Sequence, residues 1–332
     1  MFRAILAATF VWAGCGASPT IAGTAPAPVD LSPASLADST RKQLDVARAV
    51  AARYASPAAA RRDRYHRIAP PELTDLNPVA GEHWIKERLL RTRTLTIDQP
   101  QYLMYYPGLG ADSLTLVGLA YAVGIPAGSP QPDGFAGDDD HWHVHLPCTR
   151  VPGLGGILAD SREQCLMLNG QPGTMQISML HVWTVASPDG PFAHYNPALP
   201  YLVSGLAVPP DDEFQLPERG RLLRELALAL GETYGAVPRM GARIAQQPDS
   251  LFADLVRPQR ERLRALVPAL RDAQQQGDTA QFTNIALAAV RAWQTIRTAY
   301  LDAAVSPEHR SILGRWFEDA SSPPTLRHHA HR

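Results

Sequence analysis

The sequence predicts an α+β protein, in which an antiparallel sheet in the middle region is flanked by an N-terminal helix and a C-terminal helical bundle. Three observations predict this class. An apolar stripe with helical spacing lies before residue 55, aromatic and β-branched runs separated by Pro- and Gly-rich segments lie within 71–210, and leucine stripes return after residue 215. Because short strands divided by loops favour antiparallel pairing, we expect an antiparallel sheet.

The N-terminal region, roughly 35–70, is predicted to be helical. Its apolar stripe consists of Leu44, Val46, Ala47, Val50, Ala51 and Tyr54. A second helix is expected to begin at Ser56 and Pro57. Serine is a favourable N-cap, and proline is tolerated at the first helical position because its missing N–H has no partner there.

The middle region is predicted to contain four strands, at 101–106, 114–123, 142–146 and 179–185. The first two are separated by a Gly-rich segment at 107–112, which predicts a hairpin. This region, 35–210 with the preceding helices included, is expected to form an α+β domain rich in histidine.

The last region, 211–319, is predicted to be a helical bundle packed on the sheet. Leu222, Leu223, Leu226 and Leu230 form one stripe. A helix starting near 248–250 is expected to be interrupted at Pro258 and Pro268, because proline lacks the N–H that the helix needs. Asp278 is predicted to cap a long helix. A final helix is expected at 306–319, and the tail 320–332 is expected to be disordered.

The start of the chain has the pattern of a secretory signal. Arg3 supplies a positive charge, and residues 4–13 are apolar over about half the length that a bilayer-spanning helix requires. Residues 1–15 are therefore predicted to be a signal peptide, and the Ala-, Pro-, Ser- and Thr-rich residues 16–34 a flexible linker.

Cys15 completes an Ala-Gly-Cys tripeptide that resembles the lipobox of bacterial lipoproteins, in which the cysteine is lipidated. Trp12 departs from that pattern, which prefers an aliphatic residue three positions before the cysteine. Lipidation of Cys15 would anchor the protein to a membrane. The alternative is cleavage after Ala22 or Ala25. Both interpretations place the mature protein in the periplasm or cell envelope.

Cysteine number and net charge restrict the possible partners. If Cys15 is set aside, Cys148 and Cys165 remain, and in an oxidising compartment such a pair predicts a disulfide. The alternatives are two buried thiols, or a Cys-plus-His metal site, because Cys148 follows His145 by three residues. The formal net charge is −1, so no nucleic-acid partner is expected.

Histidines are concentrated in the middle region, and they predict a transition-metal site. In a strand, His143 and His145 would share one face, as His-x-His ligand pairs do in many metal sites. His181 lies among apolar residues of another predicted strand, and His83 precedes Trp84. His83, His143, His145 and His181 are therefore the predicted ligands, and Zn, Cu or Fe are the ions that imidazole suits. Each histidine taken singly is more often a hydrogen-bonded core or surface residue.

The order of the motifs resembles a family of uncharacterised exported bacterial proteins. The motifs are Gly-x-His-Trp at 81–84, Trp-His-x-His at 142–145, Leu-His-x-Trp at 180–183 and Asp-Gly-x-Phe-Ala-x-x-Asn-Pro at 189–197. The resemblance covers about 40–200 and omits the C-terminal helices. It implies that His83, His143 and His181 act together and says little about a reaction.

Two functions follow as hypotheses. The first is an exported envelope protein with a histidine-based transition-metal site, in which three imidazoles and an open position would suit catalysis and a closed set would suit storage or structural support. The second is a non-catalytic envelope protein that acts through protein–protein contacts and holds no metal. Whether the protein is an enzyme, and which protein partners it has, is left open by the sequence.

Overall fold

The structure is a computed structural model that describes residues 36–67, 79–91, 94–107, 114–151, 155–159, 161–167, 169–233 and 249–303. The predicted signal peptide with Cys15, the linker, the helix at 306–319 and the tail lie outside the described residues, as does most of the predicted hairpin turn.

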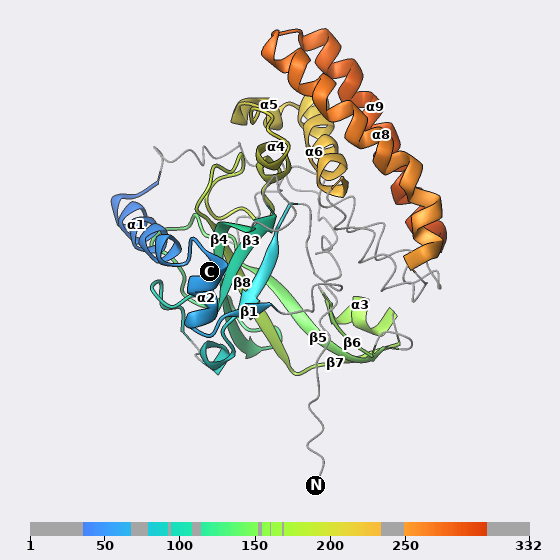
Figure 1. Cartoon of the computed structure of the whole chain (residues 1–332). Coiled ribbons are helices and arrows are strands. Elements are labelled where there is room, and N and C mark those ends of the chain that lie inside the picture. Colours follow the sequence, from blue (N-terminus) through green and yellow to red (C-terminus); the bar gives the residue numbers. More distant parts are fainter. Residues whose placement is uncertain are drawn as a thin grey trace.

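Among the described residues, eight strands form one antiparallel sheet (Figure 1). They are β1 (His66–Arg67), β2 (Glu82–Ile85), β3 (Tyr102–Pro107), β4 (Leu114–Pro126), β5 (His143–Val151), β6 (Gly155–Ala159), β7 (Gln171–Pro172) and β8 (Met175–Trp183). The order across the sheet is β1-β2-β3-β4-β8-β5-β6, and β7 pairs with β5. The four predicted strands correspond to β3, β4, β5 and β8, whereas β1, β2, β6 and β7 lie where no strand was predicted.

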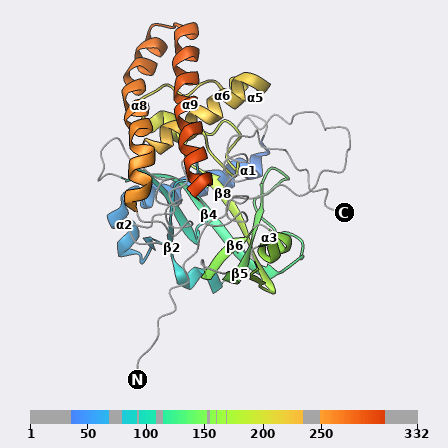
Figure 2. The same ribbon diagram turned by 90° about the vertical axis from the view of Figure 1, so that its right-hand side faces the viewer.

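Helices lie before and after the sheet in the sequence, so the predicted α+β class is confirmed. They are α1 (Asp38–Arg53), α2 (Pro57–Arg62), the 3-10 helix η2 (Glu87–Arg91), α3 (Arg162–Met167), α4 (Ala198–Val203), α5 (Asp211–Gln215), α6 (Pro217–Glu232), α8 (Asp249–Gln275) and α9 (Thr279–Ala303). In Figures 1 and 2, α1 and α2 lie beside the sheet, while α8 and α9 form a long hairpin that packs on α6.

The helix ends follow the predicted capping chemistry. The Ser56 side chain accepts a hydrogen bond from the Ala59 N–H, and Pro57 is the first residue of α2. Asp278 accepts one from the Gln281 N–H at the start of α9. These interactions satisfy N–H groups that have no partner within the helix.

Two predictions about the helices are wrong. Pro258 and Pro268 do not interrupt α8, which runs through both. Both prolines are exposed, while apolar residues on the other side of α8, including Val256, Leu263 and Leu270, are buried. Burial of that face therefore outweighs the local cost of proline, about 3 kcal/mol each. Val46 belongs to the predicted stripe of α1 but is 45% exposed, because it projects from the opposite side of the helix.

The sheet has two buried faces, and the α1 helix covers only one of them. Leu44 and Val50 of α1 pack with Trp84, Leu180 and other residues of the α1 face. The opposite face carries a separate cluster of Ile85, Tyr102, Met104, Tyr106, Val117, Ala120, Ala122, Met179, Trp183, Ala193 and Leu199. Because both faces are buried, the central strands are nearly continuous in apolar residues and lack the alternation of a half-exposed sheet.

Gly118 of β4 is closely surrounded by atoms of the neighbouring strands. A Cβ at this position would lie 2.9 Å from the Val182 carbonyl oxygen and 3.1 Å from Met104 Cε. We expect Gly118→Ala to lower the free energy of unfolding by roughly 1–3 kcal/mol, as overpacking does. Gly124→Ala on the same strand is the matched control, because a Cβ there meets nothing within 4 Å. Urea denaturation of both variants tests this, and equal stability would contradict the steric explanation.

The predicted disulfide is present between Cys148 of β5 and Cys165 of α3, with their Cα atoms 5.6 Å apart. Both residues belong to the hydrophobic cluster that also contains the buried faces of α6, α8 and α9. The bridge therefore ties the histidine-bearing strand β5 to α3 within the core that these helices share.

Removing the disulfide should destabilise the protein. The two cysteines are 17 residues apart, and in the chain-entropy model a loop of this size is worth about 3 kcal/mol. We expect the double variant Cys148→Ala, Cys165→Ala to lose about that amount in urea denaturation, and wild-type protein with reductant to match it. A thiol reagent that labels both residues in unfolded, unreduced protein would show that the bridge does not form.

Candidate metal centre

Strand geometry places the four predicted histidines on one face of the sheet. His143 and His145 of β5 lie opposite Met179 and Ile177 of β8, so they share the face of His181, two residues further along β8. His83 of β2 lies opposite Met104, whose side chain belongs to the same face. His83, His145 and His181 are almost fully buried, and His143 is partly buried.

Curling of the sheet brings His83 and His181 together. Their strands, β2 and β8, are separated by β3 and β4. At about 4.8 Å per strand, the backbones of β2 and β8 would lie roughly 14 Å apart in a flat sheet. In the structure their Nε2 atoms are 3.4 Å apart. The residue opposite His181 on the intervening strand β4 is the small Ala120.

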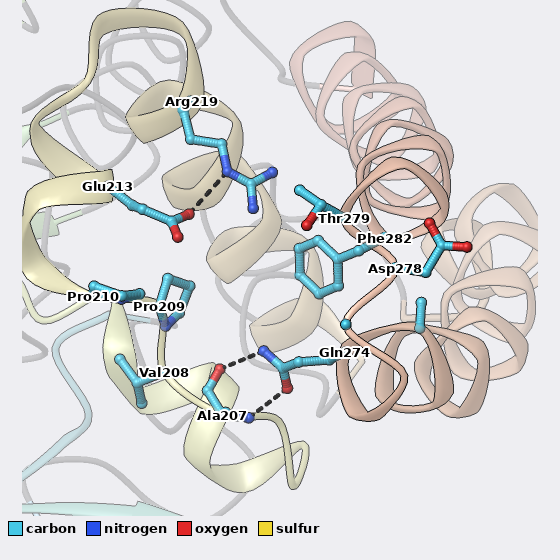
Figure 3. Close-up of a pocket in the computed structure, with 12 residues that line it drawn as sticks. Ala207, Val208, Pro209, Pro210, Glu213, Arg219, Gln274, Asp278, Thr279 and Phe282 are labelled. Atoms are coloured by element: carbon cyan, nitrogen blue, oxygen red, sulfur yellow. Dashed lines mark hydrogen bonds and ion pairs between the residues drawn. The ribbon is translucent and has the colours of Figure 1, made fainter.

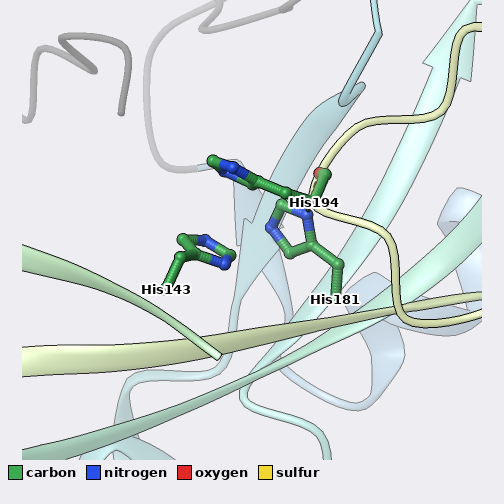
Figure 4. A group of neighbouring side chains, drawn as sticks. All are labelled: His143, His181 and His194. Carbon is green, nitrogen blue, oxygen red and sulfur yellow. Dashed lines mark hydrogen bonds between the residues drawn. The ribbon is translucent and has the colours of Figure 1, made fainter. Parts of the chain in front are cut away.

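His194 joins the cluster although it was not among the predicted ligands. It lies in the loop after β8, its ring stacks on His143 at 3.9 Å between centroids, and its centroid is 5.5 Å from that of His181. One nitrogen from each of His143, His181 and His194 lies within 4.8 Å of the other two. Figure 4 shows these three rings converging from two strands and a loop.

The loop that carries His194 is held by hydrogen bonds from β8 to its backbone carbonyl groups. The Nδ1 atom of His181 lies 2.7 Å from the carbonyl oxygen of His194. Trp183 donates from Nε1 to the Ala193 carbonyl and from its backbone N–H to Pro191. The Leu-His-x-Trp motif therefore uses its two polar rings to hold the following segment over the sheet. The bond from His181 also directs its Nε2 atom toward His83.

A buried ion pair holds the same loop from the other side. Arg224 of α6 donates two hydrogen bonds to the two carboxylate oxygens of Asp189, at 2.7 and 2.8 Å, and both side chains are 3% exposed. Gln215 of α5 donates a third. Asp189, the first residue of the Asp-Gly-x-Phe-Ala motif, thus links the loop of His194 to the C-terminal helices. A bidentate arginine–carboxylate pair fixes orientation as well as distance.

The cluster is held in its neutral state by burial. Burial lowers the pKa of His145 to about 3 and that of His181 to about 4. The pKa values of His83, His143 and His194 fall well below the ordinary value for the same reason, and the neighbouring histidines lower them further. Neutral imidazole is the form that binds a metal ion, so no proton has to leave these rings at neutral pH.

His143 has a further property that favours a ligand. Both of its ring nitrogens are buried, and neither has a hydrogen-bond partner among the described residues. Buried polar atoms are almost always satisfied, and an unsatisfied one in a native structure calls for an explanation such as an ion. His145, the fully buried neighbour on β5, has its ring centroid 5.0 Å from that of His143.

The residues before β5 have a structural role. Asp140 accepts hydrogen bonds from the Phe135 N–H and from Trp142 Nε1. It therefore stabilises the turn that leads into β5. His141 precedes the strand and is partly exposed.

No family model, curated protein or solved structure matches this chain. The resemblance of the ordered motifs to exported bacterial proteins therefore stays a prediction. Within the part of the chain that the structure describes, no helix has both the length and the apolar character needed to cross a membrane.

A pocket also lies between α5, the start of α6 and the turn between α8 and α9 (Figure 3). Its charged groups have partners in the helices: Arg219 donates to the Glu213 carboxylate and to the Thr283 hydroxyl of α9, and Asp278 accepts from the Gln281 N–H. Gln274 accepts from the N–H of Ala207 and donates to its carbonyl oxygen. Since these groups already serve the packing of the helices, the pocket has a weaker claim to a site than the histidine cluster does.

Proposed function

We propose that this protein is an exported envelope protein that holds a transition-metal ion in its histidine cluster. The proposed ligands are His83, His143, His181 and His194. The fully buried His145, whose ring centroid lies 5.0 Å from that of His143, would be available to replace one of them. The observation that carries the proposal is the 3.4 Å separation of the facing Nε2 atoms of His83 and His181. Two nitrogens bound at about 2.0–2.1 Å to a tetrahedral zinc ion lie roughly 3.3–3.4 Å apart.

The protonation of His181 leaves it able to bind a cation on the side of His83. A neutral imidazole has one N–H, and His181 directs its Nδ1 to the His194 carbonyl, which leaves a lone pair on Nε2. The Nε2 atom of His83 faces that lone pair. The tautomer of His83 with its proton on Nδ1 would offer a second lone pair to the same ion.

The donor set limits which ions fit. Imidazole suits zinc, copper and iron, whereas calcium and magnesium require oxygen ligands. The proposed ligands are all imidazoles, so the cluster favours a transition metal. The disulfide and the N-terminal pattern together support export, because disulfides persist in oxidising compartments.

Metal analysis tests the proposal. The protein is to be purified without an affinity tag and with residues 320–332 deleted, because His328, His329 and His331 in that tail could bind metal nonspecifically. We expect about one equivalent of a transition metal in this protein, retained on dialysis and removed by a strong chelator. His143→Ala should lose the metal.

The matched control is His66→Ala, which removes a histidine that lies on β1 and is half exposed. It should retain the full equivalent. If the tail-deleted protein contains no metal and takes up none from added zinc, copper or iron, the proposal is wrong, and the hypothesis of an envelope protein that acts through protein contacts is favoured.

A further inference from the structure

Positive charge is concentrated where α2, β1 and η2 meet at one edge of the sheet. Residues 61–67 and 82–88 contain six Lys or Arg residues against three carboxylates, whereas the whole chain has a formal net charge of −1. Two of the six pair with carboxylates: Arg67 with Glu82 and Lys86 with Asp63. The other four are exposed and form no ion pair with a carboxylate in the part of the chain that the structure describes: Arg61, Arg62, Arg64 and Arg88. These four residues are called the arginine face.

Contacts with Trp84 place the end of α2 on the edge of the sheet. Arg67 lies opposite Trp84 in the pairing of β1 with β2. The Cζ atoms of Arg61 and Arg67 lie 5.1 and 5.7 Å from the centroid of the Trp84 ring, which is the range of cation–π contacts. Trp84 is almost fully buried and Arg61 is exposed, so Arg61 lies on the outer side of this contact beside the edge strand β1.

Arg88 of η2 also lies close to the end of α2. The Nζ atom of Lys86, just before η2, is 2.6 Å from Oδ2 of Asp63, the residue that follows α2. Burial raises the pKa of the Asp63 carboxyl, but hydrogen bonds from Lys86 and a tyrosine lower it, and the charges of Lys86 and Arg88 lower it further. Glu87 lies 3.5 Å from Nε2 of His66. The nearby carboxylates therefore have other partners, and Arg88 keeps an unneutralised charge.

Arg64 has a backbone conformation that favours glycine. Its φ is 67°, in the left-handed region, directly after the end of α2, where glycine is the usual residue because it has no Cβ. The Arg64 side chain is exposed and forms no hydrogen bond or ion pair with any described residue. Its guanidinium thus contributes no such interaction to the fold, although the arginine costs more than glycine at this position. A partner outside the chain would explain the residue.

We propose that the arginine face rests on an anionic lipid surface and binds the phosphate groups of its headgroups. Guanidinium groups bind phosphate through two parallel hydrogen bonds, and clusters of about four to eight basic residues beside a membrane bind anionic lipids. Leu90, two residues after Arg88, is 40% exposed and would enter the apolar boundary of such a surface. The inference rests on the export part of the proposed function, because the predicted N-terminal signal and lipid would bring this face to a membrane.

Vesicle binding tests the inference on protein that begins at residue 16, which lacks Cys15 and therefore any lipid. The protein is mixed with vesicles of phosphatidylglycerol and phosphatidylcholine, and with vesicles of phosphatidylcholine alone. The test variant removes three charges without a hydrogen-bond or ion-pair partner among the described residues: Arg62→Gln, Arg64→Gly and Arg88→Gln. The control variant has the same net charge and removes three exposed charges from α6 and α8: Arg221→Gln, Arg262→Gln and Arg264→Gln.

We expect wild type to bind the anionic vesicles at low ionic strength and to leave the phosphatidylcholine vesicles unbound. Each arginine near an anionic surface contributes about five-fold to binding, so the test variant should bind roughly 100-fold more weakly. The control variant should bind within a few-fold of wild type, because its charges lie away from the arginine face. Glycine suits the backbone at position 64, so urea denaturation should find the test variant as stable as wild type.

Two results would overturn the inference. One is a wild-type protein that fails to bind the anionic vesicles, including the case in which it binds soluble polyphosphate instead. The other is equal weakening of the test and control variants. Vesicle binding requires neither export nor a metal ion, so its failure would leave those proposals standing. Export would be contradicted separately, by cell fractionation that finds the protein in the cytoplasm.

Discussion

Replacing His181 by alanine is expected to abolish metal binding and the thermal stabilisation that the metal provides. His181 belongs both to the facing pair with His83 and to the group formed with His143 and His194. A ligand present at about 1,000 times its dissociation constant stabilises the native state by roughly 4 kcal/mol. For a domain of 150–250 residues, that corresponds to a rise in melting temperature of roughly 8–16 °C.

The measurement compares the melting temperatures of wild type and His181→Ala, each with and without added zinc. The melting temperature of wild type should rise by roughly 8–16 °C with saturating zinc, and that of the variant should not rise. The variant also leaves the His194 carbonyl without its partner, a loss worth about 1–3 kcal/mol that appears equally without metal. His66→Ala should respond to zinc as wild type does. A zinc-dependent rise of wild-type size in His181→Ala would exclude this residue from the ligands.

The part of this site that could be predicted from the sequence is the part determined by strand alternation. Side chains two apart on a strand share a face, so His143 and His145 had to lie together once 142–146 was recognised as a strand. His181 was predicted to be a ligand for a different reason, which is that a histidine among the apolar residues of a strand has a specific partner. The disulfide followed from the number of cysteines that remained and the predicted compartment.

The rest depends on long-range packing that local patterns do not contain. His194 lies in a loop without periodicity, and it reaches the cluster because His181 and Trp183 bond the backbone of that loop. Its sequence signal was only its place in the Asp-Gly-x-Phe-Ala motif. The approach of His83 to His181 depends on the curl of the sheet, and β2 is too short for its pattern to be distinguished from a loop.

The second large effect is expected on the stability of the protein when Arg224 of α6 is replaced. We expect Arg224→Ala to destabilise the protein by about 3–5 kcal/mol, because it leaves the Asp189 carboxylate buried without its charge partner. Urea denaturation measures this. Arg221→Ala is the matched control, since Arg221 is exposed on the same helix and its loss should change stability by no more than about 0.5 kcal/mol.

The same ion pair should affect the metal site, because Asp189 belongs to the loop that carries His194. Residues that orient a metal ligand typically contribute 10–100-fold to metal affinity, so Asp189→Asn, which keeps the size of the side chain, should weaken zinc binding by about that factor. The protein can also be loaded with Co²⁺ in place of zinc. A general loss of stability would not shift the visible absorption spectrum of the cobalt in the folded fraction, whereas a displaced His194 would. If stability falls while the zinc affinity and the cobalt spectrum stay unchanged, the Arg224–Asp189 pair contributes only to the packing of the protein. A shifted spectrum would show that the C-terminal helices determine the coordination of the metal through this loop.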